Sequence, residues 1–246
     1  FGTNPCLFPD SMIETIHGRV KIKDITSPTM VYSMGDDGKL CIKPCSASWI
    51  SKRYTKTIKV NIASGHSVRC TPDHKIYIVE RGWVEAQDVH IGDKVVHLSR
   101  NRRGAAYSGV KLTSQGKREH VMEHRLVFEA VNGKIPEDHA TLTALEQPNN
   151  HMITGIRDHS PGRHGNYYGF ISPPNSRQGA KVVIPMPQEL KSNLHQYPTV
   201  VSIEEGEMSD VYDLTVEDTH NFIADFVVVH NCSEIILRSA QVCNLS

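Results

Sequence analysis

The 246-residue sequence has no net charge and no long apolar run, and each absence excludes a class of function. Lysine and arginine together number 27, as do aspartate and glutamate, so no overall field attracts nucleic acid or an anionic membrane. No apolar stretch approaches the roughly 20 residues of a membrane span, and no cationic leader precedes an apolar run. We therefore expect a protein without a membrane role, located by default in the cytoplasm.

The cysteines lack the spacing of a zinc site. There are six: Cys6, Cys41, Cys45, Cys70, Cys232 and Cys243. The Cys41-x-x-x-Cys45 pair has no second Cys or His pair to complete a tetrahedral site, so we expect no bound metal. A chain that relies on free thiols belongs in a reducing compartment. We expect Cys41, Cys45 and Cys70 to be structural.

Short β-branched runs separated by turn residues occupy two parts of the chain. From about residue 11 to 98 the pattern predicts strands and hairpins, as where Ile58, Val60 and Ile62 alternate with polar residues. Strand-like sequence returns from 198 to 230. The hydrophobic content of 39% is enough for a core. We predict a mainly β fold of which these parts are two halves.

The intervening segment, about residues 101–196, has a different pattern. It is rich in His, Asn, Gly and Pro, and Met122, Leu126 and Ala130 form an apolar stripe with i, i+4 spacing. This stripe predicts one helix. We interpret the segment as a partly helical insertion into the β fold.

The sequence Asn231-Cys232 near the end carries unusual chemistry. An asparagine side-chain amide can attack its own backbone carbonyl, close a succinimide ring and break the following peptide bond. A cysteine just beyond can accept an acyl group, and the thiol of Cys6 could likewise attack the carbonyl of Pro5 to give a thioester. These residues favour a chain that cuts itself at both ends of residues 6–231 and joins what lies outside, in a single turnover and without a cofactor.

Five sequence blocks in a fixed order resemble those of an intein of the Hint type. They are CLFPDSMIET at 6–15, GHSVRCTPDH at 65–74, GWVEAQDV at 82–89 with IGD at 91–93, VYDLTV at 211–216 with HNFIA at 220–224, and VVVHNC at 227–232. The resemblance implies a compact, horseshoe-shaped, all-β splicing domain made of residues 6–100 and 197–231, with its two ends close together. Such a domain acts on its own flanking segments, and we expect a monomer.

Thr71 and His74 fit the first step of that chemistry. The exchange of an amide for a thioester is uphill, so donors are needed where the oxyanion grows, and Thr71 and His74 are suited to this. His74 could also protonate the departing amide nitrogen of Cys6, because an imidazole has a pKa near neutrality. In isolation, a Thr-x-x-His sequence is more often a turn with a surface histidine.

The later steps involve a second set of residues. Asp213 resembles the position that takes the proton from Cys232, although a buried Asp213 could simply be bonded to a backbone amide. His220 and His230 would polarise the carbonyl of Asn231 and activate its side-chain amide.

The segments outside the two cuts, residues 1–5 and 232–246, would be extein remnants. Joined, they read Asn4-Pro5-Cys232-Ser233-Glu234-Ile235 and end in Cys243-Asn244-Leu245, which resembles an active-site segment of a ribonucleotide reductase. That resemblance implies a radical site at Cys232, a reducing thiol at Cys243, and substrate-binding or proton-transfer roles for Asn4 and Glu234. So short a segment cannot reduce ribonucleotides by itself.

The insertion resembles a degenerate HNH-type homing endonuclease, beginning at residues 131–138. A single His139 stands where a histidine-rich stretch is expected, so its metal site would be lost. Weak DNA binding through basic residues such as Arg100 and Lys111 is an alternative. Three classes of function therefore stay open: self-splicing, a nuclease, and a structural or binding module.

Overall fold

The computed structural model describes most of the two β-rich parts of the chain and some of the segment between them. It describes residues 6–103, 107–113, 121–134, 139–143, 153–158, 167–168 and 197–231. The expected helix and both expected β-rich parts lie within these ranges. The expected extein residues do not.

The largest sheet has eight strands in the order β4-β3-β1-β18-β19-β8-β9, with β2 paired to β1. Its strands are β1 Met12–Thr15, β2 Gly18–Lys21, β3 Thr29–Met34, β4 Leu40–Cys45, β8 Lys75–Ile78, β9 Gly82–Glu85, β18 Asn221–Ala224 and β19 Val227–His230. Two smaller sheets contain β16 Val200–Glu205 with β6 Ile58–Ile62 and β7 Ser67–Cys70, and β17 Ser209–Asp213 with β5 Trp49–Thr55.

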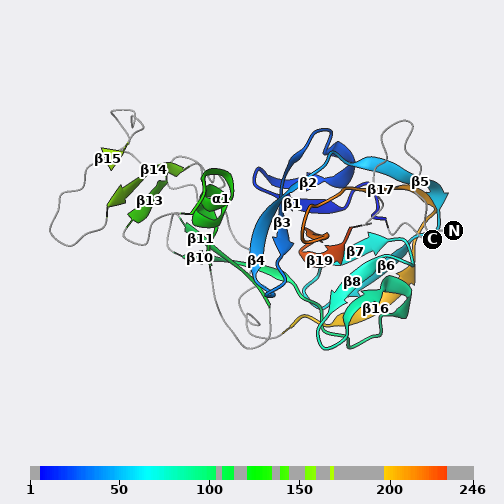
Figure 1. Cartoon of the computed structure of the whole chain (residues 1–246). Coiled ribbons are helices and arrows are strands. Elements are labelled where there is room, and N and C mark those ends of the chain that lie inside the picture. Colours follow the sequence, from blue (N-terminus) through cyan, green and yellow to red (C-terminus); the bar gives the residue numbers. More distant parts are fainter. Residues whose placement is uncertain are drawn as a thin grey trace, which may run out of the picture.

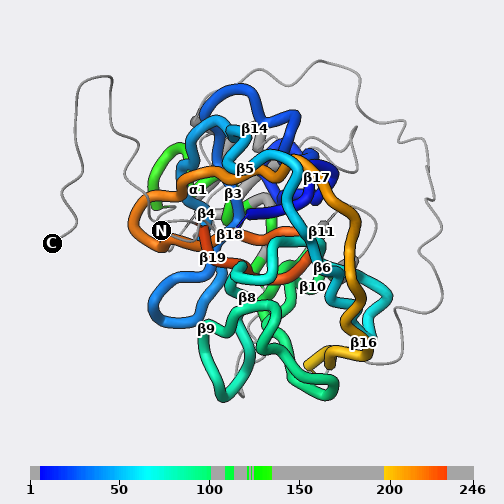
Figure 2. The backbone as a smooth tube through the Cα atoms, turned by 90° about the vertical axis from the view of Figure 1, so that its right-hand side faces the viewer, coloured from blue at the N-terminus to red at the C-terminus, as the bar shows by residue number. Residues whose placement is uncertain are grey.

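Strands from the two β-rich parts of the sequence pair with one another throughout. The hairpin β18–β19 lies between β1 and β8, β16 pairs with β6, and β17 pairs with β5. Figure 1 shows the curled β domain formed in this way, and Figure 2 shows β17 running alongside β5. The prediction of a mainly β fold built from two halves is confirmed.

The strand β19 is buried on both faces, which explains its run of three valines. Val227 and Val229 pack into one hydrophobic cluster, and Val228 packs into a second. A central strand with both faces covered has no polar alternation. Packing from both sides fixes the position of the strand, and with it the position of His230 and Asn231 at its end.

The segment expected to be an insertion begins as a continuation of the first β-rich part. Strand β10 (Leu98–Arg103) runs across the expected boundary at residue 100 and pairs with β11 (Tyr107–Leu112), which pairs with β12 (Val121–Met122). The predicted helix is present as α1 (Glu123–Asn132), with Val127 buried against the second cluster. Figure 1 shows α1 between the β domain and a small sheet of β13 (His139–Thr143), β14 (Ile153–Asp158) and β15 (Tyr167–Tyr168). Among the described residues, no helix has the length and apolar character needed to cross a membrane.

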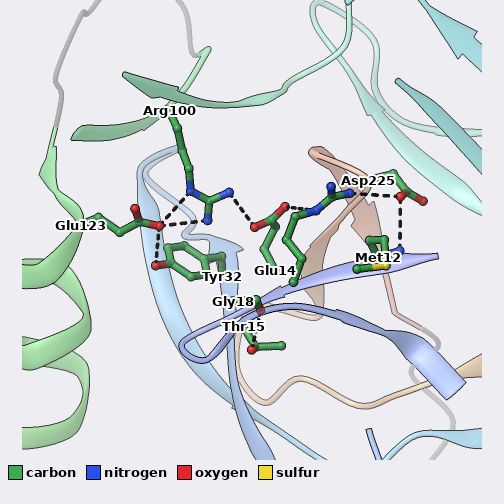
Figure 3. Close-up of polar contacts among 9 residues, drawn as sticks. Met12, Glu14, Thr15, Gly18, Tyr32, Arg100, Glu123 and Asp225 are labelled. Atoms are coloured by element: carbon green, nitrogen blue, oxygen red, sulfur yellow. Dashed lines mark hydrogen bonds and ion pairs between the residues drawn. The ribbon is translucent and has the colours of Figure 1, made fainter. Parts of the chain in front are cut away.

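A chain of buried ion pairs ties the insertion to the β domain (Figure 3). The guanidinium of Arg100 contacts Glu14 at 2.7 Å and Glu123, the first residue of α1, at 2.9 Å. Glu14 also pairs with Arg19 at 3.1 Å, and Tyr32 donates a hydrogen bond to Glu123 at 3.0 Å. Arg100 is therefore held between two carboxylates, and Lys111 is buried.

Replacing Arg100 with methionine should lower the free energy of unfolding by about 3 kcal/mol, because it leaves two buried carboxylates short of a cation. Burial already raises the pKa of Glu14, and Arg100 opposes this shift. The loss should therefore shrink as pH falls and Glu14 becomes protonated. Urea unfolding at two pH values measures both effects. The control is Arg125→Met, which removes a part-exposed i, i+4 pair with Glu129 and should cost roughly 0.5 kcal/mol or less. If both variants lose the same free energy of unfolding, the ion pairs of Arg100 contribute no more to stability than a part-exposed pair.

Candidate active site

Cys6 is completely buried and is held by the Thr-x-x-His turn. The amide nitrogen of Cys6 donates a hydrogen bond to Thr71 Oγ1 at 3.0 Å, and the backbone nitrogen of Thr71 donates to the carbonyl oxygen of Cys6 at 2.9 Å. The next residue, Leu7, bridges to both Tyr212 and Cys70. Thr71 therefore contacts the same amide nitrogen that would depart when Cys6 attacks the preceding carbonyl.

His74 is fully buried, unlike the surface histidine that an isolated Thr-x-x-His sequence favours. Its backbone nitrogen donates to the carbonyl oxygen of Thr71 at 3.0 Å, and its carbonyl oxygen accepts from the backbone nitrogen of Ala86 at 2.7 Å. These bonds close the turn at both ends. The imidazole is thereby placed at the start of β8, three residues from the threonine that holds Cys6.

Strand register brings the two ends of the splicing domain to the same place. Val229 of β19 is opposite Ile76 of β8, and extending this antiparallel register by two residues puts Asn231 opposite His74. On the other side, the backbone nitrogen of Asn231 donates to the carbonyl oxygen of His220 at 3.1 Å. Asn231, which is completely buried, therefore lies between the Thr-x-x-His turn and the residue that precedes β18.

His230 contacts the carbonyl that asparagine cyclisation would attack. Its Nδ1 lies 2.5 Å from the carbonyl oxygen of Asn231, and Trp83 packs edge-on against its ring at 4.9 Å between centroids. Because a carbonyl oxygen only accepts, Nδ1 must be the donor. Burial lowers the pKa of His230, which favours the neutral ring at neutral pH. A neutral imidazole can donate from Nδ1 and still accept a proton at Nε2.

His220 and Asp213 complete the set of expected residues in the described part of the chain. His220 has a left-handed backbone (φ 49°) and an exposed side chain, and its carbonyl oxygen accepts the hydrogen bond from the backbone nitrogen of Asn231. Asp213 is buried at the end of β17 and accepts a hydrogen bond from the backbone nitrogen of Leu214 at 2.8 Å. This is the bond expected of a purely structural aspartate, but the charge of Asp213 also raises the pKa of Cys6.

The thiol of Cys6 is protonated at neutral pH. Burial raises its pKa to about 12, a hydrogen bond with Ser51 opposes the shift, and the charge of Asp213 adds to it. The first step therefore needs a proton acceptor and groups that favour the thiolate. Ser51 and its neighbour Lys52 were not identified from the sequence, because neither belongs to a recognisable motif.

Other expected residues fall outside the site or outside the described residues. Cys45 and Cys70 lie in the hydrophobic core, as expected for structural cysteines. The residues with expected roles that lie outside the described part of the chain are Asn4, Pro5, Cys232, Glu234 and Cys243.

The fold and the site define a β domain whose two ends meet at one buried set of Cys, Thr, His and Asn residues. A family model of the intein splicing domain matches residues 12–231. Since this match covers most of the chain, the chain belongs to the intein splicing domain family.

Solved inteins share the fold. The crystal structure of a variant of the Ssp DnaB mini-intein superimposes with a TM-score of 0.55 at 13% identity, covering 96% of this chain and 99% of that one. A DnaB intein from Synechocystis sp. gives a TM-score of 0.50 at 14% identity, covering 93% and 99%. At such low identity the likeness concerns the fold alone, and it confirms the predicted Hint-type architecture.

Curated relatives match over short segments of long proteins. The chain is 33% identical over 91 residues to protein RecA of Mycobacterium tuberculosis, a match that covers 37% of this chain and 11% of RecA. It is 51% identical over 43 residues to the ribonucleoside-diphosphate reductase NrdEB subunit alpha of Bacillus subtilis, covering 18% of this chain and 4% of that one. The chain thus spans about a tenth or less of the length of these relatives.

Proposed function

We propose that residues 6–231 excise themselves and join residues 1–5 to residues 232–246. Membership of the intein splicing domain family and the intein fold support autocatalytic protein splicing as the function. One observation carries the residue-level proposal: the turn that holds Cys6 also lies opposite Asn231 across β8 and β19. Chemistry at the two ends of the segment can therefore share one set of groups.

In the first step, the sulfur of Cys6 attacks the carbonyl carbon of Pro5. A C–S bond forms and the C–N bond to Cys6 breaks. His74 takes the thiol proton and delivers it to the departing nitrogen, which Thr71 holds by the hydrogen bond described above. The imidazole is unchanged at the end of the step. Thr71 favours the correct orientation of the scissile amide.

In the second step, Cys232 attacks the new thioester. Its sulfur forms a C–S bond to the acyl group while the bond to Cys6 breaks, and Asp213 passes the proton from one thiol to the other. The buried carboxylate and its electrostatic effect on Cys6 support this role. The exchange depends on proximity, which can be worth an effective concentration of about 10⁵ M or more.

In the third step, the side-chain nitrogen of Asn231 attacks its own backbone carbonyl. A succinimide forms, the bond to Cys232 breaks, and a proton moves from the amide nitrogen to the nitrogen of Cys232. The contact between His230 Nδ1 and the attacked carbonyl oxygen supports a donor role in this step. His220 is proposed to assist from the other side. The remaining thioester then rearranges to an amide.

We also propose that the flanking segments belong to a ribonucleotide reductase. The joined sequence around Asn4, Cys232 and Glu234 supports this, as does the match at 51% identity to a ribonucleoside-diphosphate reductase subunit. In the host, Cys232 would carry the radical and Cys243 would be a reducing thiol. The splicing nucleophile would then return to the host as an active-site residue.

A nuclease or DNA-binding role for residues 101–196 is not favoured. The family match assigns the chain to splicing, and the relatives and structures described above include no nuclease. His139 and His151, on which such chemistry would depend, have side chains outside the described part of the chain.

Splicing predicts a specific change of mass in the purified protein. The 27.5 kDa precursor should convert under reducing conditions into the excised segment 6–231 and a ligated peptide of residues 1–5 and 232–246. The conversion should proceed equally in EDTA, because no step uses a metal. Intact-mass spectrometry over several days measures the conversion with and without EDTA. A precursor that stays intact, with neither terminus released, would contradict the proposal.

A further inference from the structure

Two consecutive residues of β5, Ser51 and Lys52, lie beside Cys6. Strand β5 pairs with β17, where Trp49 is opposite Asp213 and Lys52 is opposite Val211. The side chain of Ser51 forms a hydrogen bond with that of Cys6. Tyr212 of β17 is opposite Ile50 and also pairs with Leu7, the residue after Cys6, so the strand pairing brings β5 close to the nucleophile.

Lys52 is fixed by an ion pair with Asp73, a residue inside that turn. The ammonium nitrogen lies 3.3 Å from Asp73 Oδ2, and the side chains are only 32% and 16% exposed. Asp73 directly precedes His74, and Thr71 holds the backbone of Cys6. The ion pair thus links β5 to the turn that holds Cys6.

The charges that face this thiol oppose one another. The carboxylates of Asp213 and Asp73 disfavour a thiolate at Cys6, whereas the ammonium group of Lys52 and the hydrogen bond from Ser51 favour it. Burial, the largest effect, also disfavours the charged form, so the thiolate depends on the two groups that β5 supplies.

We propose that Ser51 and Lys52 activate Cys6 for the first step: the Ser51 hydroxyl donates a hydrogen bond to the Cys6 sulfur as its proton leaves for His74, and Lys52, oriented by Asp73, offsets the two carboxylates. This inference rests on the proposed splicing function and adds to it two residues that no sequence block contains. Ser51 touches the reacting atom, and Lys52 acts on it through space.

The test isolates the first step in an Asn231→Ala, Cys232→Ala background of the 246-residue chain, in which neither acyl transfer to residue 232 nor cyclisation can follow. Dithiothreitol intercepts the Cys6 thioester and releases residues 1–5, and the rate is followed by intact mass from pH 7 to 9.5. Each variant is compared with the background protein at the same pH, so that the ionisation of dithiothreitol affects both rates equally. Ser51→Ala should slow release about tenfold at each pH.

The charge of Lys52 is tested by a matched pair of variants and a control. Lys52→Met should slow release roughly threefold to tenfold, since the group is partly screened by solvent, and Lys52→Arg should restore most of the rate. Ser51→Thr, which keeps the hydroxyl, should likewise recover much of the loss. The control Lys56→Met removes an exposed pair with Glu205 at 2.7 Å and should leave the rate unchanged.

Each outcome separates this inference from the proposed function. If Ser51→Ala and Lys52→Met both release residues 1–5 as fast as the background protein does, the inference is overturned but the proposed splicing function is not affected. The inference would also be overturned if the slow variants have lowered melting temperatures and Ser51→Thr and Lys52→Arg do not restore the rate. That result would indicate a packing role for both side chains. If the background protein releases no residues 1–5 at any pH, the proposed first step itself fails.

Discussion

Replacing Asn231 with alanine should abolish release of the C-terminal segment while leaving the chemistry at Cys6 intact. Alanine has no side-chain nitrogen to attack the backbone carbonyl, so no succinimide can form whatever His230 and His220 contribute. The backbone bond from the nitrogen of residue 231 to His220 does not depend on the side chain and should persist. We expect no free residues 232–246, but dithiothreitol should still release residues 1–5. Intact-mass spectrometry distinguishes the two cuts.

Asn221 offers a matched control for this variant. It is also a buried asparagine, and its amide exchanges hydrogen bonds of 2.8 Å with the backbone nitrogen and carbonyl oxygen of Met34. Asn221→Ala should lower the free energy of unfolding by about 1–3 kcal/mol, because it leaves these groups unpaired, but both cuts should continue in the folded protein. If the chain were only a structural or binding module, neither these two variants nor their parent would be cleaved. C-terminal release from Asn231→Ala at the parental rate would exclude cyclisation as the cutting step.

The strands could be predicted from the sequence because their burial pattern is local. Ile58, Val60 and Ile62 are buried and alternate with residues that face outward, as period-two patterning requires. Their neighbours in the sheets could not be predicted in this way. The hairpin β18–β19 enters between β1 and β8, which are far away in the sequence, and only the buried contacts of the folded chain select that position.

The residues that form or break covalent bonds could also be identified from the sequence. Few side chains can perform the chemistry of Cys6 or Asn231, so residue type and order are informative. The function of Ser51 and Lys52, in contrast, depends on how β5 lies against β17 and the Thr-x-x-His turn. A serine and a lysine in a strand are otherwise typical of a solvated face.

Arg100 shows why charged residues mislead when only the sequence is considered. It stands near Arg102 and Arg103, and such a basic cluster suggests contact with phosphates. In the folded chain its partners are Glu14 and Glu123, one far before it in the sequence and one in the insertion. Neither partner can be recognised without the tertiary structure. The same ion pairs join the insertion to the splicing domain, so the insertion can affect splicing through stability alone.

Replacing His74 with alanine should slow release of residues 1–5 by dithiothreitol about 10²- to 10⁴-fold, the usual contribution of a positioned acid or base. The imidazole is buried where water cannot substitute for it, and Cys6 has a pKa too high to ionise without an acceptor. Thr71 alone can orient the scissile amide but cannot move the proton. C-terminal release should fall less, because His230 contacts the carbonyl attacked by Asn231.

His97 provides the control for the cavity that this variant creates. It is also a buried histidine, stacked on the ring of Phe226 at 5.7 Å between centroids, at the turn end of the β18–β19 hairpin and so at the opposite end from Asn231. His97→Ala should lower stability in urea as much as His74→Ala does, yet it should keep the rate of release of residues 1–5 within about threefold of the parent, because distant sites are nearly independent. If the two variants lose the same activity, packing explains the effect. If only His74→Ala loses it, the imidazole is required for the acyl shift itself, and raising the pH should recover part of the rate as the thiolate forms without an acceptor.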